Sequence, residues 1–198
     1  MALFTLANWP LLFLSAAMIV AAVIDAWKLK VPNWLTFPLV LSGWTFGLLH
    51  DVGFFAGSGV GGIGASLVGT ALGFALLLPV YAIGGMGAGD VKMQMGFGSW
   101  VAAFFGLGFG LKVIFYAFCV ATIIGGVMAA IMIAVRGQYR RNAENTRAIV
   151  GDLLTAGSVG EVADRAAKRK SRMHLLPYGI PLCIGFIGYV EFILRSQG

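Results

Sequence analysis

Two aspartates are the residues of this chain whose type and setting best suit chemistry. Asp25 closes a long apolar run, and Asp90 lies in a glycine-rich segment further along. A carboxylate at the margin of a membrane costs free energy unless it is paired, hydrated or neutralised, so two of them indicate a functional site. If the two carboxylates meet, they can share one proton. The ionised member can then deprotonate a water while the protonated member polarises a carbonyl, which is the chemistry of hydrolysis by paired carboxylates.

The composition indicates a polytopic membrane protein with one helical domain over residues 1–198. Hydrophobic residues make up 59% of the chain and charged residues 11%, and the mean hydropathy is +0.89, which excludes an ordinary soluble domain. The 29 glycines fit this interpretation because small residues let transmembrane helices approach closely. Cys119 and Cys183 lie in apolar segments without metal-ligand spacing, so neither a disulfide framework nor a metal site is expected.

Charged residues divide the sequence into apolar runs of about the 20 residues that a membrane-spanning helix needs. They predict an all-α fold with about six transmembrane helices at Ala2–Ile24, Val31–Leu49, Ala65–Ile83, Met93–Leu111, Val113–Val135 and Leu175–Leu194. The polar segment 136–174 is expected to be a cytoplasmic loop. We interpret it as a solvated connector with a basic end near the membrane, while docking of a partner or of anionic lipid stays open.

The distribution of basic residues predicts the orientation. If the first helix runs from outside to inside, twelve of the 14 lysines and arginines face the cytoplasm, as the positive-inside rule requires. Lys112 and Arg195 are then the two on the outside, and the basic residues of the 136–174 loop account for most of the cytoplasmic excess. Asp25 and Asp90 both fall on the cytoplasmic side. A cleaved signal peptide is the alternative for the first run, but the required positive charge does not precede it.

Three neighbours of Asp90 are candidate supporting residues. Gly87 and Gly89 remove side-chain bulk and allow backbone geometry that other residues avoid, which can bring the carboxylate close to another helix or to a bound peptide. Lys92 could favour an ionised form of Asp90. It could equally be an anchor on the cytoplasmic side.

The segment after Asp25 contains a second pair of candidates, Pro32 and Asn33. Proline is tolerated in the first turn of a helix, so Pro32 is expected to begin the second span. Asn33 is expected to bond a backbone carbonyl of the turn, or alternatively to position Asp25.

These segments resemble three blocks of the type IV prepilin peptidase family. Residues 25–36, DAWKLKVPNWLT, are similar to the first block, in which an aspartate is followed by a Pro-Asn element. Residues 84–92, GGMGAGDVK, contain the GxGDxK pattern of the second. Residues 176–181, LPYGIP, resemble the Pro-Phe-Gly-Pro block at the start of the last helix, with a tyrosine and an inserted isoleucine as departures. GxGD is a weak pattern alone, but the combination is specific and spans nearly the whole chain.

The resemblance implies a six-span membrane aspartic endopeptidase. Such an enzyme removes the basic leader of a prepilin or pseudopilin after a glycine at the cytoplasmic face of the inner membrane, and so serves type IV pilus assembly and protein secretion. Asp25 and Asp90 match the catalytic pair. The implied partners are the prepilin, with its basic leader and apolar helix, and the lipid bilayer. No nucleic acid is expected.

The resemblance also indicates a short form of the family. Bifunctional members carry a soluble domain with two CxxC pairs that bind zinc, and they methylate the new amino terminus. This chain contains no CxxC. Methyltransferase activity, a metal and a cofactor are therefore not expected, and the chain is similar to the dedicated peptidases of tight-adherence (Flp) pili or archaeal flagellins.

Three alternatives remain from the residues alone. A presenilin-like protease shares GxGD, but it would place the first aspartate inside a helix, whereas Asp25 abuts Lys28 and Lys30. A small transporter would use carboxylates as proton or cation ligands, usually near the bilayer midplane. A non-catalytic pilus assembly scaffold descended from the peptidases is the third.

Overall fold

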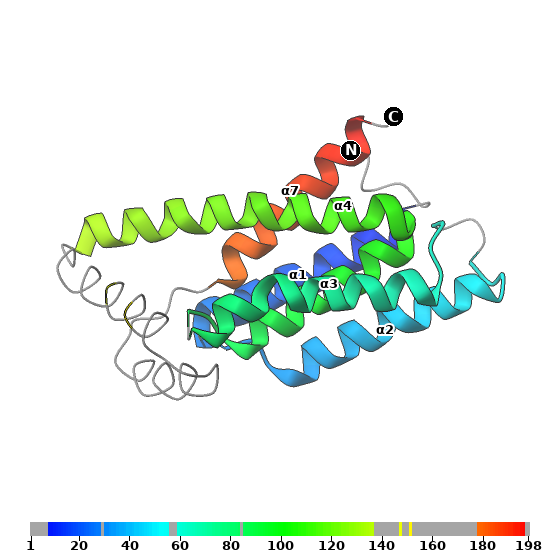
Figure 1. The fold of residues 1–198 in the computed structure, drawn as a ribbon, viewed down its shortest axis with the longest axis horizontal. Helices are drawn as coiled ribbons and strands as arrows, with labels where there is room; N and C mark the ends of the chain where they lie inside the picture. Colours follow the sequence, from blue (N-terminus) through cyan, green and yellow to red (C-terminus); the bar gives the residue numbers. More distant parts are fainter. Residues whose placement is uncertain are drawn as a thin grey trace.

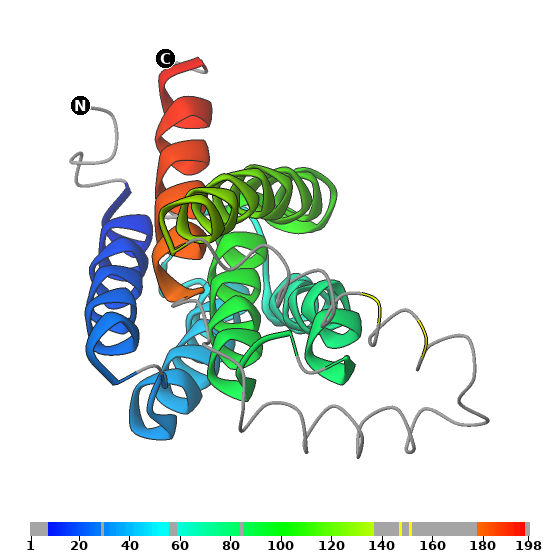
Figure 2. The same cartoon turned by 90° about the vertical axis from the view of Figure 1, so that its left-hand side faces the viewer.

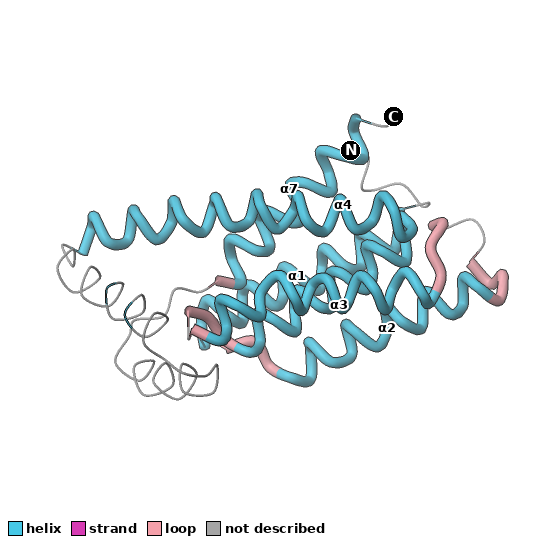
Figure 3. Tube along the Cα trace, in the orientation of Figure 1, coloured by secondary structure: helices cyan, strands magenta, loops and turns pink. Residues whose placement is uncertain are grey.

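The fold is a bundle of α-helices, and a computed structural model describes residues 8–28, 30–55, 59–83, 85–136, 147, 151 and 178–196. Figure 1 shows the helices and Figure 3 the loops between them. The elements in chain order are α1 (Trp9–Lys28), α2 (Asn33–Asp51), α3 (Ile63–Ala82), α4 (Ala88–Arg136) and α7 (Gly179–Ser196). Within these ranges there is no strand, so the predicted all-α class is confirmed.

Helix α4 folds back on itself at Gly106. This residue has φ 80° and ψ 171°, a conformation that glycine adopts and other residues avoid. We call residues 88–105 the first arm of α4 and residues 107–136 its second arm. The arms approach each other closely beside the turn, because a Cβ built on Gly110 in the second arm would lie 2.8 Å from the Ala102 Cα in the first.

The predicted division between the fourth and fifth spans was therefore misplaced. The sequence interpretation used Lys112 as the boundary, but Lys112 lies inside the second arm and the chain turns at Gly106. A charged residue near a helix end can stay helical if its side chain reaches water, as the exposed Lys112 does. Glycine with a positive φ was the physical boundary, and the many glycines of this region obscured it.

The other helix bounds lie near the predicted ones, with one useful difference. Helix α1 continues past Ile24 to Lys28, so Asp25 is inside its last turn and not beyond its end. Helix α3 begins at Ile63, two positions before the prediction, and α7 is described from Gly179 onward. The beginning of the first predicted span and nearly all of the 136–174 loop lie outside the described residues.

Four helices of the described part are long and apolar enough to cross a membrane: α1, α3, α4 and α7. Since α4 folds back at Gly106, its two arms would be separate passes. Together with α2 they form the six helical segments that correspond to the predicted runs. Helix α2, which is less apolar and contains Pro38, is not among the four.

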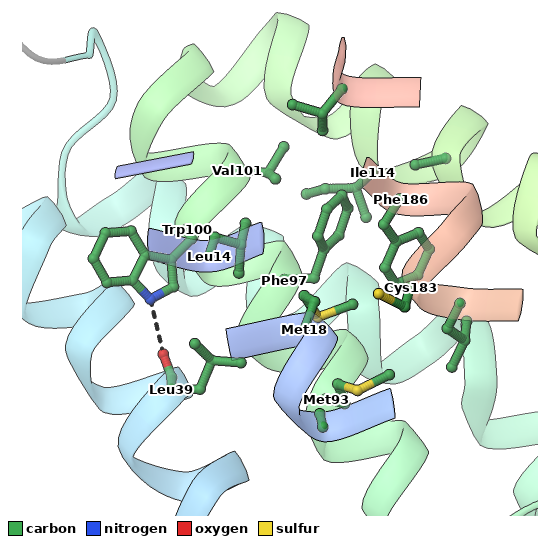
Figure 4. Close-up of a cluster of buried hydrophobic side chains, with 14 of the residues drawn as sticks. Leu14, Met18, Leu39, Met93, Phe97, Trp100, Val101, Ile114, Cys183 and Phe186 are labelled. Atoms are coloured by element: carbon green, nitrogen blue, oxygen red, sulfur yellow. Dashed lines mark hydrogen bonds between the residues drawn. The ribbon is translucent and has the colours of Figure 1, made fainter. Parts of the chain in front are cut away.

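The first arm of α4 is the centre of the bundle, with α1, α2, α3 and α7 around it (Figure 2). Its Phe97 ring stacks on Phe186 of α7 with centroids 4.1 Å apart, and Figure 4 shows Met18 of α1 beside this pair. Trp100 donates its indole N–H to the Leu39 carbonyl of α2 at 3.0 Å, which satisfies the polar atom of a buried ring. The central arm therefore fixes the other helices relative to one another.

Glycine-to-glycine contact joins the first arm of α4 to α3. A Cβ built on Gly69 would overlap the Gly98 carbonyl, and a Cβ on Gly98 would overlap the Gly69 carbonyl. In lipid, helices associate largely by such close packing because the acyl chains are as apolar as the side chains. The two backbones therefore approach as closely as they do only because neither position carries a side chain.

We predict that Gly69→Leu destabilises the bundle while Gly64→Leu, on the same helix, does not. A leucine at Gly69 overpacks a backbone contact, a change that costs about 1–3 kcal/mol of unfolding free energy. A Cβ at Gly64 meets no atom within 4 Å, so it controls for the loss of glycine in α3. Thermal unfolding of the purified protein in detergent measures the difference. Equal melting temperatures for the two variants would show that α3 and α4 are not packed in this way.

Candidate active site

Asp25 binds the beginning of the last helix. Its side chain is only 3% exposed, and Oδ2 accepts a hydrogen bond from the Gly179 N–H at 2.9 Å. Gly179 is the first residue of α7, where the helix leaves its leading N–H groups without partners and carries a partial positive charge. The carboxylate thus finds both a donor and a favourable field in a place where it is shielded from water.

The absence of a side chain at Gly179 makes this contact possible. A Cβ built there would lie 2.9 Å from both the Cβ and Oδ2 of Asp25, closer than real Cβ contacts. Any other residue at this position would therefore push the carboxylate away from the helix end.

Asp90 is held at a helix N-terminus in the same manner. It is the third residue of α4 and is 5% exposed, and its Oδ2 accepts the Gly87 N–H at 3.2 Å. This is the reciprocal half of a capping box, in which an acidic side chain in the first turn reaches back to the residue that precedes the helix. Gly87, a predicted supporting residue, therefore contacts the carboxylate through its backbone.

The segment Tyr178–Gly179 is related to both carboxylates in different ways. Asp25 accepts the Gly179 N–H directly. Tyr178 lies in the turn before α7, where burial raises the pKa of its phenol most and the negative charge of Asp90 raises it further. The beginning of α7 is therefore a contact of Asp25 and is within the electrostatic influence of Asp90.

A second contact brings the surroundings of the acids together. A Cβ on Gly89 would lie 2.8 Å from the Val31 carbonyl, so the segment that joins α1 to α2 packs directly on the first turn of α4. Val31 is 2% exposed and belongs to the core. The chain following Asp25 is therefore fixed against the residue preceding Asp90, and Gly89 makes this approach possible.

A hydrogen bond between Lys92 and Asn33 links α4 to α2, which begins directly after Pro32. The Lys92 ammonium donates to Asn33 Oδ1 at 2.9 Å and lies 4.5 Å from the centre of the Phe37 ring. The Asn33 side chain was expected to bond a turn carbonyl or Asp25 through its amide nitrogen, and neither bond is found among the described residues. Its amide oxygen instead accepts the bond from Lys92. Pro32 directly precedes the first residue of α2, with φ −74° and ψ 146°, so the second helix begins one residue later than the sequence predicted.

Tyr178 and Gly179 are the site residues that the sequence interpretation did not name as such. The signal was present, because they lie in the LPYGIP segment that resembles a family block. What the sequence did not show is that the backbone of this segment bonds Asp25. Among the described residues there is no cluster of three histidine, cysteine, aspartate or glutamate side chains that could hold a metal ion.

The apolar helices, with two buried acids at one end, define a membrane protein with a candidate carboxylate site. A family comparison makes the class specific: the sequence model of the type IV leader peptidase family matches residues 12–130, and the chain belongs to this family. Membership makes it a peptidase, and the matched range includes both Asp25 and Asp90. No curated protein and no solved structure matches the chain.

Gln94 lies one helical turn beyond Asp90 and generates a stability prediction. It is fully buried, and neither amide atom finds a hydrogen-bond partner among the described residues. An unsatisfied buried polar group costs about 1–3 kcal/mol, so we expect Gln94→Met, which is similar in size, to raise the melting temperature in detergent. Thr70→Val is the control, because Thr70 accepts the Trp44 indole N–H at 2.9 Å and its loss should lower the melting temperature. A fall with Gln94→Met would contradict the prediction.

Proposed function

We propose that this protein is an aspartic endopeptidase that removes the basic leader of type IV prepilin-like proteins, after a glycine, at the cytoplasmic face of the inner membrane. The observation that carries the proposal is the burial of Asp25 and Asp90 at one end of the bundle, where each accepts a backbone N–H at the beginning of a helix and the segment after Asp25 packs on Gly89. Family membership supports the peptidase chemistry and a prepilin-like substrate. Cleavage after glycine and the basic leader rest on the resemblance of the GGMGAGD and DAWKLKVPN segments to the family's blocks.

The proposed reaction needs only the two side chains and a water. One carboxylate of the pair is ionised and the other protonated. The ionised group takes a proton from the water as its oxygen attacks the scissile carbonyl carbon, and the protonated group gives its proton to the carbonyl oxygen. The tetrahedral intermediate then collapses and the carbon–nitrogen bond breaks. The leaving amine takes up the proton held by the first carboxylate, and the second carboxylate takes back a proton from one hydroxyl of the intermediate as the carbonyl re-forms, which restores the pair. The helix N-terminus beside each acid stabilises the carboxylate form of whichever member is ionised at that step.

The basic residues of the described part support a cytoplasmic site. Lys28, Lys30 and Lys92 lie at the end of the bundle that carries the two acids, since Lys28 ends α1, Lys30 follows it and Lys92 is near the beginning of α4. Lys112 and Arg195 lie near the opposite end, close to the turn at Gly106 and the end of α7. Positive charge concentrates on the cytoplasmic side of membrane proteins. The same rule would keep the basic leader of a substrate on that side, next to the acids.

We expect Asp25→Asn and Asp90→Asn each to lower cleavage of a prepilin by at least about 100-fold, because general acid–base catalysis contributes about 10²–10⁴-fold. The assay reconstitutes the purified protein in liposomes with a prepilin that retains its leader and follows the shortened product. The control is Asp51→Asn. Asp51, the last residue of α2, accepts the Ile63 N–H at 2.8 Å at the other end of the bundle, and the side-chain oxygen of an asparagine can accept the same bond.

This experiment distinguishes a specific role of Asp25 and Asp90 in cleavage from an effect of replacing any aspartate. Undiminished cleavage by either variant of the pair would refute the assignment of that residue. Loss of cleavage in Asp51→Asn with an unchanged melting temperature would show that the assay does not report on the two-aspartate site.

We also expect Gly179→Ala to reduce kcat by about 10–100-fold with little effect on KM. The added methyl displaces Asp25, and a displacement of about 1 Å of a catalytic group can cost about 10²-fold. Gly188→Ala on the same helix is the matched control, since a Cβ there meets nothing within 4 Å. Single-turnover cleavage in liposomes is measured for both variants. Wild-type kcat in Gly179→Ala would show that the Gly179 contact does not position Asp25 for the reaction.

A further inference from the structure

An apolar pocket opens beside the two acids. It has a volume of about 240 Å³ and lies between α3, the second arm of α4 and the beginning of α7. Leu77 and Val80 line it from α3, and Leu182 lines it from α7. Among the described residues that form its wall, only Thr122 and Tyr178 carry a polar side-chain group. The pocket is larger than the cavity of about 150 Å³ that can hold a benzene molecule, so it can accept an aromatic or large aliphatic side chain.

The wall of this pocket is continuous with the candidate active site. Met86 lines the pocket and directly precedes Gly87, whose N–H bonds Asp90. Tyr178 also lines the pocket and directly precedes Gly179, whose N–H bonds Asp25. Two residues of the pocket wall thus directly precede the two glycines whose N–H groups bond the carboxylates.

The second arm of α4 supplies a wall that another helix can approach. Between Phe118 and Val135 only Ala121 and Gly125 are buried. Ile123, Val127 and Ile131 recur at every fourth position with more than half of each side chain exposed, as expected of a lipid-facing surface. Apart from Phe118, the residues of this arm that line the pocket are small. At Gly126 a Cβ would meet no atom within 4 Å, so this part of the wall is uncovered.

We infer that this pocket binds the apolar segment of the substrate on the carboxyl side of the cleaved bond. The inference rests on the proposed function. A prepilin-like substrate stays in the membrane through an apolar helix, and that helix must lie beside the acids while the peptide bond before it is cleaved. The pocket is apolar, is continuous with the residues that bind Asp25 and Asp90, and is bounded by small residues that permit close helix packing. A large apolar side chain just after the cleaved bond fills it.

The test fills the pocket without touching the acids. Gly126→Leu places an isobutyl group in the open space of the pocket, and Gly108→Leu places the same group on the same arm, where a Cβ also meets no atom within 4 Å and the pocket is not lined. We expect Gly126→Leu to raise KM for a reconstituted prepilin by about tenfold or more, the loss expected when one large apolar side chain is excluded from its site. The kcat should change little, and Gly108→Leu should match the wild type in both constants.

Substrate variants identify the occupant. The first residues after the cleaved bond are replaced singly with alanine and assayed with wild type and with Gly126→Leu. Two changes that affect one contact are not additive. We therefore expect one alanine substitution to raise KM for the wild type while having little further effect on Gly126→Leu.

Three results would overturn the inference. The first is a wild-type KM for Gly126→Leu, and the second is full additivity for every alanine substitution. The third is a change in oligomeric state of Gly126→Leu in detergent with an unaltered KM, which would make the pocket a contact between copies of this chain. None of these results bears on the two aspartates, whose role is tested separately by loss of cleavage in Asp25→Asn and Asp90→Asn.

Discussion

The hydrogen bond from Gly179 to Asp25 ties the end of the first helix to the beginning of the last. Shielded from water, a carboxylate needs donors and opposite charge, and a helix N-terminus supplies both. One oxygen of Asp90 accepts a backbone N–H in the same way, from the residue before its own helix. Much of the arrangement follows from these two needs. The end of α1 and the beginning of α7 must meet at the end of the bundle where α4 begins, and the residues at their junctions must be small.

Glycine makes that arrangement possible along the whole length of the bundle. Gly69 and Gly98 let α3 touch the first arm of α4, and a Cβ on Gly185 of α7 would lie 2.5 Å from the Ala121 Cα of the second arm. Because lipid offers little hydrophobic drive for helix association, such backbone contacts replace it. The central arm is consequently held from several sides. Asp90, at the beginning of this arm, is placed by packing that extends far from the site.

The fold class and the two acids could be predicted from the sequence because their signals are local. Apolar runs of spanning length predict helices, and the aspartates stand out because so few charges accompany them. The turn at Gly106 could not be predicted, because it depends on one backbone conformation in a region with many glycines. The role of Asn33 was missed for a different reason. Its partner, Lys92, is far away in the sequence, and only the packing of α2 on α4 brings them together.

The same limit explains why Tyr178 and Gly179 were recognised as a motif but not as part of the site. Gly179 bonds Asp25 and Tyr178 is influenced by Asp90, and both acids lie far from this segment in the sequence. The family match ends at residue 130 and therefore covers both acids without α7. Pattern and spacing identify groups that could react. They do not show which distant backbone N–H will satisfy a buried charge.

The turn at Gly106 also has a consequence for biogenesis. Between Lys92 and Arg136 the chain carries a single charged residue, Lys112. The two arms of α4 are joined without an intervening polar loop. A hairpin of these arms that enters the bilayer from the cytoplasm therefore moves one ammonium group, and almost no polar backbone, across the membrane. Lys112 lies close to the tip of this hairpin, where its long side chain can reach the far interface. The translocation step that normally accompanies a new pair of spans is thereby reduced to a single lysine.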